Sequence, residues 1–258
     1  MRPAQKDWNP GAYARFRGLR LRPALDLLAQ VGDLPPGDVI DLGCGDGAAA
    51  GALTARFADR RIVGVENSPA MLEQAFGYDA KHQADIASWV PDTPPALIFS
   101  NAALHWLPDH DHLMPRLAGF LAPGGVLAVQ MPRQFLAPSH RFLRDIATAM
   151  FPDRFDLAHY QPPVCPAVQY HQMLAPLGRV TAWETDYVQA LGPVSEGHPV
   201  RAFTGATAMR PFLDKLTEAE AAQFTAAYDT ALGAAYPLDA QGGALFPFRR
   251  CLFVLEMP

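Results

Sequence analysis

The segment VIDLGCGDG, residues 39–47, joins a short apolar run to a glycine-rich turn, and alanines follow it directly. A buried strand, a tight glycine turn and a helix in this order are typical of the first unit of a doubly wound α/β sheet. Glycine suits the turn because it lacks a Cβ, so the backbone can bend sharply and a ligand can approach it closely. The segment therefore predicts an α/β fold with a ligand at this turn.

The chain beyond this turn alternates between β-prone and helical segments, which predicts a doubly wound sheet of parallel strands. The expected strands are residues 38–42, 61–66, 81–85, 96–100 and 126–131, with later strands at 179–191 and 251–256. The expected helices are residues 48–58, 69–76, 109–121, 139–150 and 218–236. The glycines of PGG, residues 123–125, suit a left-handed end to the helix at 109–121.

The remaining segments are expected to complete a single domain that spans residues 1–258. Residues 10–31 carry apolar side chains at helical spacing, which predicts one or two amphipathic helices against the edge or top of the sheet. The proline-rich residues 151–166 predict a loop. We expect a cofactor-binding half at residues 37–132 and a helical cap formed by insertions at about residues 151–178 and 192–247.

The composition indicates a globular protein that acts on a small molecule. Half of the 258 residues are hydrophobic and 18% are charged, which is typical of a folded core rather than a disordered chain. The formal net charge is -5 and no basic run is present, so we expect no nucleic-acid partner. No apolar stretch approaches the roughly twenty residues of a bilayer span, and the first residues, MRPAQKDWNP, lack the apolar core of a signal peptide.

The cysteines and histidines indicate neither a disulfide framework nor a metal site. Cys44, Cys165 and Cys251 lie far apart and form no CxxC pair, so we expect three free thiols and a cytoplasmic location. The eight histidines show no HxxxH spacing, so we expect no metal dependence. The sequence leaves the oligomeric state open.

The residues of the glycine turn bear on two classes of ligand. Gly43, Gly45 and Ala48 satisfy the GxGxxA pattern of dinucleotide-binding turns, so a nicotinamide cofactor is one alternative. Asp41 precedes the turn, and Asp46 lies inside it, where it would repel an entering pyrophosphate but not a cationic ligand. The acidic turn therefore favours a ligand that carries positive charge.

Two further acids fit an adenosine. Glu66 follows the turn by about twenty positions, where a carboxylate can accept hydrogen bonds from both ribose hydroxyls. Asp85 ends the next expected strand, and with Ile86 it suits the amino group and one face of an adenine ring. An adenosine joined to a small zwitterionic tail without phosphate describes S-adenosylmethionine, whose ammonium and sulfonium are both positive.

Several segments resemble class I S-adenosylmethionine methyltransferases: VIDLGCGDG, VGVENSPAML, ADIASW, LIFSNAALHWLPDH and LAPGGVLAVQMP. Three others, WNPGAYARF, HPVRAFTGATAMRPFLDKL and LFPFRR, are similar to the trans-aconitate 2-methyltransferase group within that class. The resemblance implies a Rossmann-like α/β fold with seven strands, mostly parallel, the last inserted antiparallel beside the sixth, and S-adenosylhomocysteine as a product. Asp46 and the ENS segment depart from the usual family pattern.

The site residues follow from these motifs. The expected cofactor-binding residues are Asp41, Gly43, Gly45, Gly47, Glu66, Asn67, Asp85, Ile86 and Asn101. The catalytic candidates are His105 and Trp106, just beyond the fourth strand. The expected substrate-binding residues are Trp8, Tyr13, His105, Arg210 and Arg249. Consecutive strand residues face opposite ways, so Arg249 and Arg250 cannot both serve.

Each of these residues also has a purely structural interpretation. The glycines would then form a tight turn, Asp41 would cap loop amides, and Asp85 would be a solvated loop acid. A histidine or tryptophan after a strand is often part of the core, and an arginine is more often a solvated or ion-paired group.

The favoured function is methyl transfer from S-adenosylmethionine to a carboxylate of a small polycarboxylic acid, with trans-aconitate preferred. A carboxylate is already ionised near neutral pH, so His105 would orient the acceptor rather than deprotonate it. Arginine forks match carboxylates, which favours an anionic acceptor. The alternatives are another carboxylate, including a carrier-bound acyl chain, a hydroxyl or amine acceptor with His105 as base, an NAD-dependent oxidoreductase, and a non-catalytic cofactor-binding module.

Overall fold

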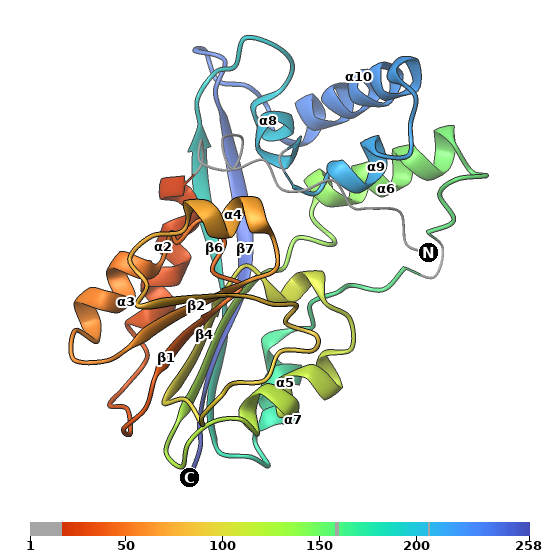
Figure 1. The fold of residues 1–258 in the computed structure, drawn as a ribbon. Helices are drawn as coiled ribbons and strands as arrows, with labels where there is room; N and C mark the ends of the chain where they lie inside the picture. The colour runs from red at the N-terminus through yellow and green to blue at the C-terminus, as the bar shows by residue number, and fades with distance from the viewer. Residues whose placement is uncertain (1–16, 158–159, 206) are drawn as a thin grey trace. The chain divides into compact units, whose positions relative to one another are not determined.

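The computed structural model describes residues 17–157, 160–205 and 207–258, and the side chains from residue 21 onward within these ranges. The chain divides into two compact units (Figure 1). Unit 1 comprises residues 1–132, 163–185 and 250–258, and unit 2 comprises residues 133–162 and 186–249. Trp8 and Tyr13, which the sequence analysis assigned to substrate binding, lie outside the described residues.

The central element is a seven-stranded sheet with the order β3-β2-β1-β4-β5-β7-β6. The strands are β1 Val39–Leu42, β2 Ile62–Glu66, β3 Ala80–Gln83, β4 Leu97–Asn101, β5 Val126–Pro132, β6 Arg179–Leu191 and β7 Ala244–Glu256. Strands β1 to β5 pair in parallel, and β7 pairs antiparallel with β5. The predicted seven-stranded fold is confirmed, although β7 begins well before the expected residue 251.

Helices α2 (Arg17–Leu28) and α3 (Ala50–Arg56) cover one face of the sheet in unit 1. Leu27 and Leu53 are fully buried in the core that they form with the strands. Burial of one such leucine contributes about 1.5–3 kcal/mol. The segment at residues 10–31 was expected to lie against the edge or top of the sheet, and this is wrong for α2, because its apolar stripe packs on the face.

Helices α5 (His110–Ala118) and α7 (Ala167–Leu174) contribute to the core on the opposite face. His110 Nδ1 lies 2.6 Å from the hydroxyl oxygen of Tyr170, and the Tyr170 ring stacks on Phe253 with centroids 5.0 Å apart. Tyr170 and Leu174, four positions apart, are both fully buried. Residues 163–178 therefore belong to unit 1, and assigning this part to the cap was wrong.

The PGG glycines do not end α5. The helix stops at Ala118, and its C-cap Gly119 has right-handed angles, with φ at -65°. Gly124 has a φ of +74° and lies in the turn that leads into β5. The expected left-handed glycine is present, but it shapes the turn before a strand rather than the end of the helix.

Unit 2 contains four helices within its described residues: α6 Pro138–Met150, α8 Pro199–Gly205, α9 Arg210–Leu213 and α10 Glu218–Ala235. Helix α10 begins with a capping box, in which Thr217 and Glu220 exchange hydrogen bonds. The Tyr228 hydroxyl donates to the Ser139 carbonyl at 2.7 Å and so links α10 to α6. Among the helices that the structure describes, none has the length and apolar content of a bilayer span.

Candidate active site

The carboxyl ends of β1 and β4 mark the place where the strand order reverses, because β1 lies between β2 and β4. Open α/β sheets bind ligands at such a switch point. The glycine turn follows β1, and a short 3-10 helix, η1 (Leu104–Trp106), follows β4. Most of the predicted cofactor residues belong to these strand ends, all within unit 1.

The three glycines of the turn have positive φ angles, +80° at Gly43, +56° at Gly45 and +81° at Gly47. A Cβ on Gly43 would lie 2.2 Å from the Cβ of Ala103, and one on Gly47 would lie 3.0 Å from backbone atoms of Phe76. A Cβ on Gly45 would have its nearest neighbour, a Met71 methyl, at 3.4 Å. The chain's own packing therefore requires glycine at 43 and 47.

Asp41 is buried beneath the turn, with 2% of its surface exposed. Burial raises the pKa of its carboxyl group to about 7, and the negative charge of Glu66 adds to the effect, while the hydrogen bond from Tyr78 opposes it. The Tyr78 hydroxyl donates this bond at 2.6 Å. Asp41 is thus poised to ionise when a cation approaches.

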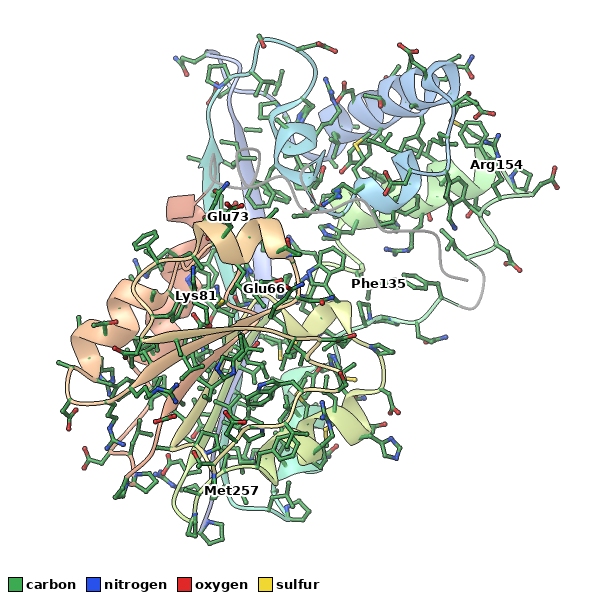
Figure 2. The ribbon with its side chains drawn as sticks, viewed as in Figure 1. Glu66, Glu73, Lys81, Phe135, Arg154 and Met257 are labelled. Carbon is green, nitrogen blue, oxygen red and sulfur yellow. The ribbon has the colours of Figure 1, made fainter. Side chains whose placement is uncertain are left out.

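Glu66 ends β2, next to helix α4 (Pro69–Gln74), as Figure 2 shows. Its carboxylate accepts three backbone N–H bonds, from Gly45 at 3.0 Å and from Asn67 and Ser68 at 2.9 Å each. These donors fix its orientation and tie the glycine turn to β2. Oε1 already accepts two of these bonds and Oε2 one, so Oε2 keeps capacity for one further donor, such as a ribose hydroxyl.

Asp85 and Ile86 follow β3 but differ in their surroundings. Asp85 is exposed, and its Oδ1 accepts the Ala87 N–H at 2.9 Å, so its carboxylate already shapes a turn. Ile86 is 9% exposed, and its Cδ1 would lie 3.3 Å from a Cβ placed on Gly43. Ile86 therefore lies directly against the glycine turn, whereas both interpretations of Asp85 stay open.

Four polar residues extend this site along one face of the sheet. Strands β1, β4, β5 and β7 all contribute to the core on the α2 and α3 side, and their core residues nearest the glycine turn are Val39, Phe99, Ala128 and Leu252. Side chains two positions apart on a strand share a face. The residues two positions nearer the edge that carries the glycine turn are Asp41, Asn101, Gln130 and Arg250. We call these four residues the polar row.

The two middle members of the polar row contain unsatisfied groups. Asn101 and Gln130 are register partners on β4 and β5. Among the described residues, the buried Asn101 Oδ1 and Gln130 Nε2 atoms have no hydrogen-bond partner. Arg250 is 2% exposed and donates from Nη1 to Gln130 Oε1 at 3.2 Å. Ala102, next to Asn101, has a φ of +55°, and such strain concentrates at functional sites.

Gln130 and Arg250 were not among the predicted site residues. The sequence signal was present, because each interrupts an apolar strand, VLAVQMP and RRCLFVLE. A polar side chain inside a buried strand either has a hydrogen-bond partner within the protein or faces a ligand site. Only the antiparallel pairing of β5 with β7 brings these two residues together.

The two catalytic candidates form η1 beyond β4. The rings of His105 and Trp106 lie with centroids 4.7 Å apart and tilted by 40°. His105 is partly buried, and Trp106 is 46% exposed, which argues against a core role for Trp106. His110 is a different case: burial lowers the pKa of its imidazole, and its Nε2 lies 3.0 Å from the Leu104 carbonyl oxygen. His110 is structural.

Arg210 and Arg249 belong to unit 2. Arg249 donates from Nε and Nη2 to the two carboxylate oxygens of Asp186, at 2.9 and 2.8 Å. This bidentate pair is about half exposed. Arg210 is partly buried at the first position of α9. Within the described residues, no group of three or more His, Cys, Asp or Glu side chains is arranged to hold a metal ion.

Comparison with known proteins places this site in context. The model of the methyltransferase domain family matches residues 13–176. A trans-aconitate 2-methyltransferase of Methylobacterium radiotolerans is 42% identical over 96% of this chain and 97% of its own length. A relative of the same name from Methylobacterium nodulans is 43% identical, with the same shares covered.

Two solved structures share the fold at low identity. Phosphoethanolamine N-methyltransferase 2 of Haemonchus contortus, in complex with S-adenosyl-L-methionine, matches with a TM-score of 0.52 and 14% identity, over 92% of this chain and 53% of that one. The YcgJ protein of Bacillus subtilis matches with a TM-score of 0.54 and 14% identity, over 92% and 98%. At this identity the likeness concerns the fold alone.

Proposed function

The chain belongs to the trans-aconitate 2-methyltransferase family, and we propose that it transfers a methyl group from S-adenosylmethionine to a carboxylate oxygen of trans-aconitate. The products are the methyl ester and S-adenosylhomocysteine. The observation that carries the proposal is identity of about 40% along 96% of the chain, which includes unit 2 as well as the cofactor motifs.

The residues of the site suit a cationic cofactor better than a dinucleotide. Asp41 and Asp46 are both buried, with 2% and 6% exposed, so a pyrophosphate at the turn would meet two acids in a place poor in water. The orphaned Asn101 Oδ1 accepts hydrogen bonds and suits an ammonium. We assign the ammonium to Asp41 and Asn101, the ribose to Glu66, and the adenine to Ile86 and Asp85.

Bound S-adenosylmethionine supplies an electrophilic methyl group on a sulfonium. The acceptor carboxylate is ionised near neutral pH, so no residue of the chain must remove a proton. The chain contributes by holding the acceptor in line and excluding water, and such positioning is worth about 7–11 kcal/mol. His105 orients the acceptor, and the exposed Trp106 ring beside it shields it from solvent.

The arginines of unit 2 stay candidates for the acceptor's carboxylates. Arg249 would first have to exchange its bidentate partner Asp186 for the substrate. Arg210, at the first position of α9, lies within the segment that resembles the trans-aconitate group and is the stronger candidate of the two. If the acceptor were a hydroxyl or amine, His105 would instead act as a base, and activity would fall as the imidazole is protonated.

Methyl transfer from a labelled donor to a panel of organic acids tests the proposal. We expect a base-labile methyl ester with trans-aconitate, and calorimetric binding of S-adenosylhomocysteine but not of NAD. Label transfer to another acceptor, with none to trans-aconitate, would overturn the choice of substrate. Binding of S-adenosylhomocysteine without any transfer would identify a non-catalytic module instead.

We also propose a cytosolic protein without nucleic-acid or membrane partners. No disulfide joins Cys44, Cys165 and Cys251, and reduced cysteines are usual in reducing compartments. The net charge of -5 disfavours binding to phosphate backbones and anionic surfaces. Assay of activity in a washed membrane fraction and in the supernatant would test the location.

A further inference from the structure

Asn101 and Gln130 lie side by side at the ends of β4 and β5. They are register partners, and the residues two positions before them, Phe99 and Ala128, both belong to the core on the α2 and α3 side. The Ala102 N–H donates to the Gln130 carbonyl at 2.9 Å and fixes the end of β4 against β5. The two amide side chains therefore extend from one face of the sheet, on strands about 4.8 Å apart.

Each of these two amides has a buried atom without a hydrogen-bond partner, and the two atoms have opposite polarity. Asn101 Oδ1 is an acceptor and Gln130 Nε2 is a donor, and neither has a partner among the described residues. The orientation of the Gln130 amide is fixed, because its Oε1 accepts from Arg250 Nη1 at 3.2 Å and a guanidinium offers only donors. Buried polar side chains in native proteins nearly always have a partner. The pair therefore indicates a ligand group that carries a donor and an acceptor close together.

An α-amino acid is such a group. Its ammonium only donates, its carboxylate only accepts, and one carbon atom carries both. S-adenosylmethionine contains this group at the end of its tail. When the ammonium donates to Asn101 Oδ1, the attached carboxylate comes within reach of Gln130 Nε2 on the neighbouring strand. The carboxylates of the acceptor must instead approach the sulfonium methyl, which two methylene groups separate from that carbon atom.

We infer that Gln130 binds the carboxylate of the cofactor's amino-acid tail, while Asn101 beside it accepts from the ammonium. The inference rests on the cofactor half of the proposed function and does not depend on which acid is methylated. It gives a role to a glutamine that interrupts the apolar strand VLAVQMP. It also predicts that tight binding needs the complete zwitterion, because each charge of the tail meets an amide atom of matching polarity.

Calorimetry with three nucleoside thioethers tests the inference without any acceptor or methyl transfer. S-adenosylhomocysteine carries the complete tail, its aminopropyl analogue lacks the carboxylate, and its carboxypropyl analogue lacks the ammonium. A hydrogen bond to a charged group corresponds to a factor of about 10 to 100 in affinity. Gln130→Leu should weaken binding of S-adenosylhomocysteine by about this factor and leave the aminopropyl analogue within about twofold of its wild-type affinity. Asn101→Ala should weaken both of these ligands and leave the carboxypropyl analogue nearly unaffected.

Two further variants separate ligand contact from folding. Gln130→Glu keeps an oxygen for Arg250 and the shape of the side chain, but it places a carboxylate beside that of the ligand. It should weaken S-adenosylhomocysteine more than Gln130→Leu does, and the aminopropyl analogue should bind at least as tightly as it binds the wild type. Gln189→Leu is the matched control, because Gln189 in β6 is 3% exposed and both polar atoms of its side chain are buried without a partner among the described residues. Gln189 belongs to unit 2, and its replacement should change none of the three affinities.

Several results would overturn the inference. One needs no variant: the aminopropyl analogue binds the wild type as tightly as S-adenosylhomocysteine does. Others are equal losses for both ligands in the Gln130 variants, or the same loss in Gln189→Leu. Unchanged binding of S-adenosylhomocysteine in Gln130→Leu, with weaker binding of trans-aconitate to the resulting complex, would assign Gln130 to the acceptor instead. Failure of methyl transfer to trans-aconitate would overturn the proposed substrate and leave this inference intact, whereas a wild type that does not bind S-adenosylhomocysteine would overturn both.

Discussion

Cofactor binding should depend on pH through Asp41. In the unliganded protein the pKa of this carboxyl group is about 7, raised first by burial and then by Glu66. A bound ammonium favours the ionised form and brings the pKa back toward its usual value near 4. Binding therefore requires the group to release a proton below pH 7, and affinity should rise with pH.

The magnitude follows from the ionised fraction. That fraction rises from about 3% at pH 5.5 to about half at pH 7 for a group with a pKa near 7, so the Kd for S-adenosylhomocysteine should fall roughly fifteenfold over this interval. The ligand's own amine stays protonated in this range. Calorimetry in buffers of different ionisation enthalpy should detect release of about one proton at pH 5.5 and about half a proton at pH 7.

Two variants test whether the Asp41 carboxyl causes the pH dependence. Asp41→Asn should bind more weakly and lose the steep pH dependence. Tyr78→Phe removes a hydrogen bond that lowers the pKa of Asp41, so its midpoint should move to higher pH. A Kd that is flat between pH 5.5 and 7 in the wild type, or an equal slope in Asp41→Asn, would refute the assignment of the cationic tail to Asp41.

Because folding raises the pKa of Asp41, ionisation of this group lowers the free energy of unfolding. A carboxyl whose pKa is raised by folding binds its proton more tightly in the native state, so its contribution is complete below about pH 4 and is lost as pH rises through 7. Each tenfold change in proton affinity corresponds to about 1.4 kcal/mol, which puts the loss at a few kcal/mol. Asp41→Asn should therefore raise the Tm at pH 8 while it weakens cofactor binding, a trade expected of a functional site.

The remaining predictions concern the turn and the ribose. Gly43→Ala should lower the Tm strongly and reduce expression, because its Cβ would lie 2.2 Å from that of Ala103 at a φ of +80°; the double variant with Ala103→Gly should regain part of the loss. Glu66→Ala should weaken S-adenosylhomocysteine binding by about 100-fold in calorimetry, whereas Glu66→Gln should lose less. Equal binding by Glu66→Ala and the wild type would remove Glu66 from the ribose site.

The sequence predicted the strands well because their signals are local. β6 has the expected bounds of residues 179 and 191, and the first five strands differ from expectation by at most two residues at either end. Helix α7 was missed because it follows a proline-rich run and has only two fully buried side chains, Tyr170 and Leu174. The apolar periodicity of α7 was too weak to predict a helix from the sequence, and the packing of its two buried side chains against the sheet stabilises it.

The residues of the site that belong to contiguous motifs could be predicted from the sequence. Those that only strand pairing brings together could not. The glycine turn and Glu66 are adjacent in space because β1 and β2 are neighbours, and an N–H of that turn donates to Glu66. Alternation predicted that only one of Arg249 and Arg250 could face the site, and the sequence analysis chose Arg249. Which of the two does so depends on the register of β7 against β5, which joins residues 120 positions apart.

The order of the strands explains why this sheet suits a reaction between a cation and an anion. Side chains that point to one face from β1, β4, β5 and β7 form a diagonal series, because the registers place Asp41 level with Val254, four positions from Arg250. The ends of the series are therefore about 20 Å apart, so they can hold groups of opposite charge without neutralising each other. Direct contact between Asp41 and Arg250 would give an ion pair with little to offer either reactant. Asn101 and Gln130 lie between them, so Asp41 and Arg250 do not pair with each other, and each lies beside an amide group. If Asn101→Asp and Gln130→Glu, which reverse part of this order, leave cofactor and acceptor affinities unchanged, then the arrangement has no electrostatic role.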